Sequence, residues 1–278
     1  MNRASLKKSS RNAFIGLSVF LVMLFTLFPI WYCISTATKT AADAFSIPPK
    51  WVWSPIGDNF TEVLNTMGFK KSYLNSLIIS VQTTVLSLLF GIPCAYALAR
   101  SRSRASKFVS VWILLSRMLP AMAFAVPFYF VYKKVGLNDT YIGLTLIYLT
   151  SQLPFTVWLL NGFIRTVPEE IEEAAMIDGC NRFQILARVL VPTIQPGIST
   201  AAIFAFMSSW NEFFYAKLVS GNNTRPVSYA VYKFNNDVGT NWGLLCAASC
   251  MVALPMIAFC LLAQKSFVRG LTAGSVKG

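Results

Sequence analysis

The fold is decided by the stretch YLNSLIISVQTTVLSLLFGIPCAYALA at residues 73–99, which contains no charged side chain. A run of roughly 20 apolar residues is the length that a helix needs to cross about 30 Å of hydrocarbon. Within that layer a helix satisfies its own backbone hydrogen bonds. A transmembrane barrel would need many alternating segments of about 10 residues, and the sequence shows no such alternation. The stretch therefore predicts a membrane-spanning helix.

Comparable apolar runs recur along the 278 residues, and the mean hydropathy of +0.55 agrees with them. We expect an all-α fold, a polytopic membrane helix bundle with six transmembrane helices. Residues 1–278 are expected to form a single transmembrane domain. The expected spans are residues 13–34, 73–99, 108–132, 141–163, 197–219 and 243–263.

The first apolar run follows a basic N-terminal segment and can be interpreted as a signal peptide or as a retained span. It is longer than the usual apolar core of 7–15 residues, and no convincing small-residue cleavage site follows it, so a retained span is favoured. Basic residues are more numerous in the N-terminal segment, the two connectors 100–107 and 165–195, and the tail than in the other loops. This bias predicts a multi-pass protein with both termini in the cytoplasm.

The net charge of +13 would suggest nucleic-acid binding in a soluble protein. Here the basic residues flank apolar runs, where they orient spans and contact anionic head groups. We therefore expect membrane lipid, and no nucleic acid, as a partner. Most of the six cysteines lie in apolar runs without a CxxC pair, and histidine is absent. No metal site and no catalytic residue is expected from this composition.

One segment, TVPEEIEEAAMIDGC at residues 166–180, is too short and too charged to cross a membrane. Thr166 and Glu169 fit a capping box, and the glutamates cluster at the positive end of the helix dipole. Gly179 can end this helix in the left-handed conformation. A second helix is expected over residues 182–190, ending before Pro192.

Three environments are open for this acidic helix: solvent, the lipid surface and a protein partner. Helices that lie on lipid usually have basic polar faces. The four glutamates therefore favour a basic protein partner, and the small alanines of the segment allow another backbone to approach closely.

Residues 172–180, EEAAMIDGC, together with the stretch from Phe183 to Pro192, resemble the EAA loop of ABC importer permeases. Cys180 and Val191 depart mildly from the family pattern. In that family the loop, residues 165–195 here, forms a cytoplasmic coupling helix that docks into a cleft on the ATPase. The resemblance implies ATPase docking by Glu172, Glu173, Ala174, Ala175, Asp178 and Gly179.

Four further stretches resemble the carbohydrate-uptake, maltose-type branch of these inner-membrane permeases: RMLP at 117–120, LPF at 153–155, WNEF at 210–213 and VRGLTAG at 268–274. The resemblance implies a bacterial plasma (inner) membrane protein with three partners, namely a second permease subunit in a heterodimer, a cytoplasmic ATP-binding-cassette ATPase dimer and an extracytoplasmic solute-binding protein. The basic tail is implied to approach the ATPase. The chain lacks a G-x4-G-K-[ST] loop, so it is expected to be non-catalytic, with ATP and Mg on the ATPase subunits.

The expected function is therefore half of a translocation path for a sugar or oligosaccharide, operated by alternating access. The alternative is a stand-alone secondary transporter or channel, which would show internal repeats and more acidic groups at mid-membrane. A membrane-embedded enzyme is a third class that the residues do not support.

Two ionisable residues, Arg117 and Glu212, fall within expected spans, and such residues are functional candidates by default. They could pair with each other, hold helices in register or line the solute path. Sugar rings stack on aromatic faces, so the solute-path candidates are Trp210, Asn211, Glu212 and Arg117. Neutral oligosaccharides, uronic oligomers, polyols and glycerol phosphates all remain open as solutes, and the partner subunit can supply most of the contacts.

Overall fold

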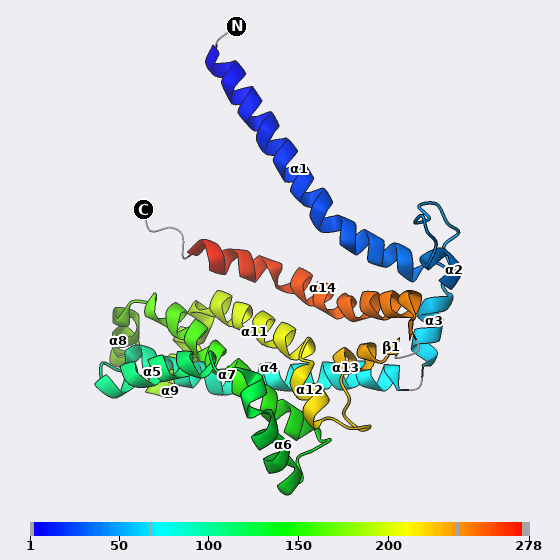
Figure 1. Cartoon of the computed structure of the whole chain (residues 1–278). Coiled ribbons are helices and arrows are strands. Elements are labelled where there is room, and N and C mark those ends of the chain that lie inside the picture. The colour runs from blue at the N-terminus through cyan, green and yellow to red at the C-terminus, as the bar shows by residue number, and fades with distance from the viewer. Residues whose placement is uncertain (1–2, 67, 237–238, 274–278) are drawn as a thin grey trace. The chain divides into compact units, whose positions relative to one another are not determined.

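The computed structural model describes residues 3–66, 68–236 and 239–273 of the chain, and these residues are mainly helical (Figure 1). The chain divides into two compact units, residues 1–67 with 233–251 and residues 68–232 with 252–278. The basic end of the tail, including Gly274 of the VRGLTAG stretch, lies outside the described residues.

The first unit is built around a long N-terminal helix and the loops that follow it. Asn59 donates hydrogen bonds of 2.9 Å to the carbonyl groups of Ala37 and Lys39, which ties the third helix to the end of the first. The side chain of Thr40 accepts a hydrogen bond from the backbone N–H of Asp43 and caps the second helix. The elements are α1 (Arg3–Ala37), α2 (Ala41–Ala44), α3 (Asp58–Asn65), the antiparallel pair β1 (Asn235–Asn236) and β2 (Gly239–Thr240), and the beginning of α14 (Trp242–Ala273).

The second unit is organised by three long helices that run side by side, α4 (Phe69–Arg100), α7 (Tyr141–Arg165) and α11 (Gln195–Trp210) (Figure 1). Shorter helices connect and flank them. These are α5 (Arg104–Ser116), the 3₁₀ helix η1 (Ala121–Phe124), α6 (Ala125–Lys134), α8 (Glu169–Ile177), α9 (Arg182–Gln184), the π-helix η2 (Ile185–Leu190), α10 (Val191–Thr193), α12 (Phe214–Val219) and α13 (Val227–Tyr232).

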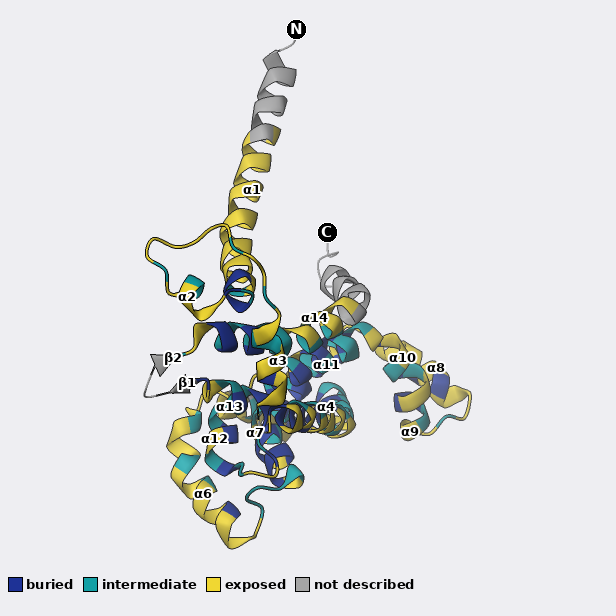
Figure 2. Cartoon of the chain, turned by 90° about the vertical axis from the view of Figure 1, so that its right-hand side faces the viewer, coloured by how far each residue is buried: buried dark blue, intermediate teal, exposed yellow. Residues whose placement is uncertain are grey.

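The faces of α4 are arranged in the opposite way from those of a helix in a soluble protein. Most of its buried residues have small or hydroxyl side chains, although Ile79 and Leu98 are buried too, and its exposed face carries large apolar ones. Figure 2 shows by colour which parts of the helices are buried and which are exposed. Small residues let neighbouring helices approach closely in lipid, where apolar surface gains nothing from burial. At Gly91 a Cβ atom would lie 2.7 Å from Cγ2 of Thr156 on α7. The buried residues include Ser72, Ser76, Ser80, Thr83, Ser87 and Ala95, and the exposed ones Leu74, Ile78, Val81, Val85 and Leu89.

The helical fold class is confirmed, and the count of six spans is not. Four helices of the described residues are long and apolar enough to cross a membrane, Phe14–Ala37, Phe69–Arg100, Tyr141–Arg165 and Trp242–Leu261. A fifth is obtained if the bent pair Arg182–Thr193 and Gln195–Trp210 is taken as one span.

Two expected spans are interrupted in the structure. The span expected at 108–132 is divided into α5, η1 and α6 by a turn over residues 117–120, because Pro120 has no backbone donor to continue a helix. The span expected at 197–219 ends as α11 at Trp210 and resumes as α12 at Phe214.

The helix expected to end before Pro192 continues to Thr193 instead, so that prediction was wrong. The π-helical turns of η2 end at Leu190, two residues before Pro192, and both a π-helical turn and a proline are usual sites of a helix kink. The chain then bends by 81° into α11.

Candidate functional site

The acidic helix α8 begins and ends with well-defined caps. Pro168 is its N-cap residue, and the hydroxyl group of Thr166 donates 2.7 Å to the carbonyl of Phe163 instead. The predicted capping box was therefore wrong, because Thr166 completes α7. At the other end Gly179 has φ +84°, and the N–H of Cys180 donates to the carbonyl of Ala175 at 3.0 Å. This Schellman arrangement confirms the predicted left-handed glycine.

Glu172 of α8 faces its own chain. The residue is 4% exposed, and its carboxylate lies 2.6 Å from a guanidinium nitrogen of Arg100 at the end of α4. The hydroxyl group of Tyr96 donates to the same carboxylate at 3.0 Å. Arg100 also donates to the carbonyl of Val167 at 2.9 Å, just before α8. Glu172 therefore positions α8 on α4, and its carboxylate is not open to a second protein.

The other residues implied in docking are placed differently from one another. Ala175 is buried beside Glu172, whereas Glu173, Ala174, Asp178 and Gly179 are exposed. Ile177 shares the exposed side and is 87% exposed. We call Glu173, Ala174, Ile177 and Asp178 the α8 face.

The α8 face is supported by a continuous apolar core. Val167 is packed with Leu160 and Ile164 of α7, Ala95 of α4 and Leu190 of η2. The residue just before α8 is therefore fixed in the apolar core that α4, α7 and η2 share.

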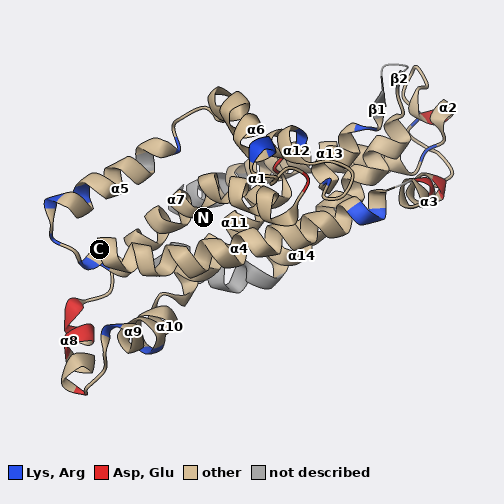
Figure 3. Ribbon diagram, turned by 90° about the horizontal axis from the view of Figure 1, so that it is seen from below, with Lys and Arg blue, Asp and Glu red and all other residues tan. Residues whose placement is uncertain are grey.

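The sequence reasoning missed Arg100 and Tyr96, and it assigned all four glutamates to a partner protein. Two of them form ion pairs within the chain, Glu172 with Arg100 and Glu169 with Arg102, the latter at 3.0 Å. Figure 3 shows the acidic α8 close to the basic start of α5 and to α9. The signal was available, because the basic connector 100–107 and the acidic segment were both expected on the cytoplasmic side.

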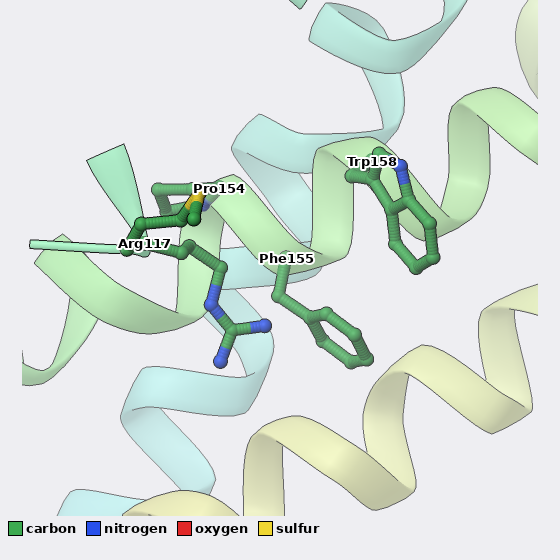
Figure 4. Close-up of a pocket in the computed structure, with 5 residues that line it drawn as sticks. Arg117, Pro154, Phe155 and Trp158 are labelled. Carbon is green, nitrogen blue, oxygen red and sulfur yellow. The ribbon is translucent and has the colours of Figure 1, made fainter. Parts of the chain in front are cut away.

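Arg117 lines a cavity of about 480 Å³ together with Met118, Pro154, Phe155 and Trp158. Its guanidinium carbon lies 4.6 Å from the centre of the Phe155 ring, and Figure 4 shows the guanidinium group directed toward that ring. Trp158, the other aromatic residue of the cavity, is half exposed. Aromatic faces next to a cation can bind a polar ring compound.

The remaining solute-path candidates do not line this cavity. Trp210 is fully buried and donates from its indole N–H to the carbonyl of Val252 at 3.1 Å. Asn211 is exposed and donates to the carbonyl of Met207 at 2.9 Å. The carboxylate of Glu212 accepts a hydrogen bond from the backbone N–H of Tyr215, in the first turn of α12, at 3.0 Å.

Arg117 and Glu212 therefore have separate roles. Among the residues that the structure describes, the three ion pairs join other side chains, so these two do not pair with each other. Glu212 holds the break between α11 and α12 in place, whereas Arg117 remains a candidate for contact with solute.

A second polar cluster, which the sequence did not indicate, joins the loop before α7 to the loop after α12. Asp139 has φ +56°, and its carboxylate accepts backbone hydrogen bonds from Gly221, Asn223 and Thr224 and one from the hydroxyl of Thr224. Burial raises the pKa of the carboxyl group, but these hydrogen bonds outweigh that effect and hold the pKa of Asp139 below its usual value. The cluster fixes the loop between α12 and α13.

Comparison with known proteins gives a consistent result. The family described as "Binding-protein-dependent transport system inner membrane component" matches residues 87–267. The diacetylchitobiose uptake system permease of Streptomyces coelicolor is 33% identical over 254 residues, covering 91% of this chain and 92% of that protein. The trehalose transport system permease of Mycobacterium tuberculosis is 31% identical over 264 residues, covering 93% and 95%.

One solved structure is similar to this chain over nearly its whole length. It is that of a bacterial ABC transporter involved in the import of the acidic polysaccharide alginate, with a TM-score of 0.78 and 25% identity, covering 96% of this chain and 99% of that one. The chain therefore belongs to the family of binding-protein-dependent transport system inner membrane components, the permease subunits of ABC importers.

Proposed function

We propose that this permease is one of two membrane subunits of a bacterial carbohydrate importer, and that a cytoplasmic ATPase dimer drives it by docking on the α8 face. The second permease subunit completes the translocation path, and a solute-binding protein delivers the carbohydrate. Both termini lie in the cytoplasm, and six passes cross the inner membrane, with α5, η1 and α6 together forming an interrupted third pass. ATP and Mg²⁺ are bound by the ATPase subunits.

The observation that carries the proposal is the two-sided structure of α8. Its inner side, Glu172 and Ala175, is buried against the chain and fixed by the pair of Glu172 with Arg100. Its outer side exposes Glu173, Ala174 and Ile177 to a partner. A partner that moves the α8 face therefore moves α4 as well, and this is the connection that alternating access requires.

A carbohydrate is supported as the solute by two separate findings. The relatives reported above include uptake permeases for diacetylchitobiose and trehalose. In this chain, the cavity at Arg117 offers the rings of Phe155 and Trp158 next to a cation. Flat apolar faces and a hydrogen-bond donor suit a sugar ring with its hydroxyl groups.

The docking proposal is tested by purifying the tagged chain from native membranes in mild detergent and measuring the ATPase activity that accompanies it. Glu173→Lys should remove most of this activity while leaving the amount and thermal stability of the chain unchanged. The matched control is Glu62→Lys on α3, which reverses an exposed charge far along the sequence from α8 and should retain the ATPase. Equal ATPase recovery with both variants would contradict docking on the α8 face.

The carbohydrate assignment is tested separately by uptake in cells that express the complete transporter. Labelled disaccharides should accumulate, and accumulation should stop when the ATPase is inactivated. Uptake that continues without the ATPase would support a secondary transporter instead.

A further inference from the structure

A loop of the first unit folds back along the C-terminal turns of α1. The ring of Trp51 stacks on that of Trp31 in α1, with centroids 6.1 Å apart and an interplanar angle of 10°. Trp53 contacts the same ring edge-on at 6.3 Å. Trp31 precedes the end of α1 at Ala37 by six residues, which corresponds to about 9 Å along the helix axis. The loop therefore lies beside the apolar span and does not project away from its end.

This conformation is fixed by contacts at the base of the loop. The indole N–H of Trp53 donates to the hydroxyl oxygen of Thr38 at 3.1 Å, and the backbone N–H of Ile56 donates to the Thr38 carbonyl at 2.9 Å. The ammonium group of Lys39, a buried residue, lies 4.6 Å from the centre of a Trp53 ring. The side of the loop that carries Trp53 is thus attached to the end of α1.

Several apolar side chains of the loop remain exposed. Ile47 is 97% exposed, Val52 is 84% exposed, and Phe45 and Trp51 are more than half exposed. In Figure 2 the loop after α2 is largely coloured as exposed. Exposed apolar area costs roughly 25 cal/mol per Å² in water, so these neighbouring side chains favour an apolar environment.

A cavity of about 550 Å³ continues this apolar surface toward the middle of α1. It is lined mainly by aromatic and small apolar groups, including Phe28, Tyr32, Phe45, Trp242 and Cys246. These residues come from α1, from the end of α2 and from the start of α14, within one unit. A hydrocarbon chain fits a cavity of this lining.

We propose that residues 45–53 are a membrane anchor that inserts into the lipid leaflet at the C-terminal end of α1, with a lipid acyl chain in the adjoining cavity. This leaflet is the outer one in the proposed topology. Lipid is favoured over a protein because Trp51 lies at the depth of Trp31, inside the apolar span Phe14–Ala37. The composition agrees with that of the membrane interface, where tryptophan is enriched. The single cation of the loop, Lys50, is paired with Asp43 at 2.7 Å.

The proposal is tested by placing an environment-sensitive fluorophore at Ile47→Cys in the full chain with its six native cysteines replaced by alanine. The protein is reconstituted in nanodiscs of phosphatidylethanolamine and phosphatidylglycerol. A label at residue 47 should emit at shorter wavelength and be quenched several-fold more by nitroxide lipids than by aqueous iodide. Glu62→Cys on α3 is the control and should show the reverse preference.

Iodide quenching at residue 47 as strong as at residue 62 would overturn the proposal. So would shielding that arises only when the solute-binding protein is added, because it would assign the loop to a protein partner. A second measurement avoids the cysteine replacements. In the otherwise unaltered chain, Trp51→Phe should reduce the share of tryptophan emission that brominated lipids quench, and an unchanged share would equally contradict insertion.

Discussion

The guanidinium group of Arg100, the last residue of α4, lies 2.6 Å from the carboxylate of Glu172 on α8. This pair connects a helix long enough to cross a membrane to the short acidic helix that carries the proposed docking face. Both partners make further hydrogen bonds, to Tyr96 and to the carbonyl of Val167. A partly buried charge pair with satisfied hydrogen bonds fixes orientation, and removal of one partner is costly because the other charge remains.

Replacement of Glu172 by glutamine should reduce uptake strongly while the ATPase still co-purifies with the chain. The reason is that the α8 face remains intact but its connection to α4 is weakened. A double-mutant cycle with Arg100→Gln, measured by thermal unfolding, should give a coupling free energy of about 1–3 kcal/mol. Glu169→Gln is the matched control, since its pair with Arg102 is exposed and such pairs contribute little. Equal loss of uptake in both variants would contradict the distinction.

The two alanines of the EAA segment should respond differently to arginine. Ala174→Arg, on the exposed side, should leave the thermal stability of the chain nearly unchanged and abolish recovery of the ATPase. Ala175→Arg, on the buried side, should lower the unfolding temperature and the yield, because the added volume has no space beside Glu172. Thermal unfolding and ATPase co-purification measure the two effects, and a destabilised Ala174→Arg would show that the faces are assigned incorrectly.

Arg117→Gln should lower the uptake efficiency, kcat/KM, roughly five- to thirty-fold, as expected for loss of a cation next to an aromatic ring in a solute cavity. ATPase recovery should not change, because the residue is remote from the α8 face along the chain. Arg117→Lys should recover part of the efficiency, since it keeps the charge but not the planar group. Initial rates of uptake over a range of solute concentrations measure the effect. If the unaltered chain and both variants import the solute equally well, the cavity is not part of the solute path.

Asp139→Asn should lower thermal stability at pH 7, and its difference from the unaltered chain should shrink in acid. The pKa of Asp139 is held below its usual value in the folded chain, so its contribution is complete above the ordinary aspartate pKa of about 3.9. The contribution is then lost as the pH falls through the lower folded-state pKa. Asparagine also tolerates the positive φ of this position, so the substitution isolates the charge. Unfolding temperatures across this pH range provide the measurement, and a pH-independent difference would contradict it.

Gly91→Ala should destabilise the bundle, because the new Cβ atom would lie 2.7 Å from a methyl carbon of Thr156 and would push α4 from α7. Gly162→Ala on α7 is the matched control, since a Cβ atom there meets nothing within 4 Å. That variant should be neutral or slightly stabilising by helix propensity. The unfolding temperatures of both variants in the same detergent test the close approach of α4 to α7. Equal unfolding temperatures of the two variants would disprove it.

Local signals explain the parts of the fold that were predicted correctly. The uncharged stretch at 73–99 and the run that became α7 have the length and hydropathy of spanning helices, and these properties depend on sequence alone. The left-handed Gly179 was also predictable, because few other residues adopt that conformation at the end of a helix. The interruptions near Arg117–Pro120 and at residues 211–213 were not predicted, since the few polar residues at each break are flanked by apolar runs on both sides and each stretch was therefore interpreted as one span.

The sequence by itself determined a helical membrane protein with an acidic helix of the EAA type, because hydropathy, charge and motif spacing are read residue by residue. Only the tertiary structure decided which of these two glutamates of α8, Glu172 or Glu173, is exposed to a partner. Glu172 and Glu173 are adjacent and chemically identical, but the rotation of α8 on α4 turns one toward Arg100 and leaves the other exposed. Likewise the packing against α14 buries Trp210, and the broken helix at Arg117 places its guanidinium over Phe155. Such choices depend on contacts between residues far apart in the chain, and local patterns carry no information about them.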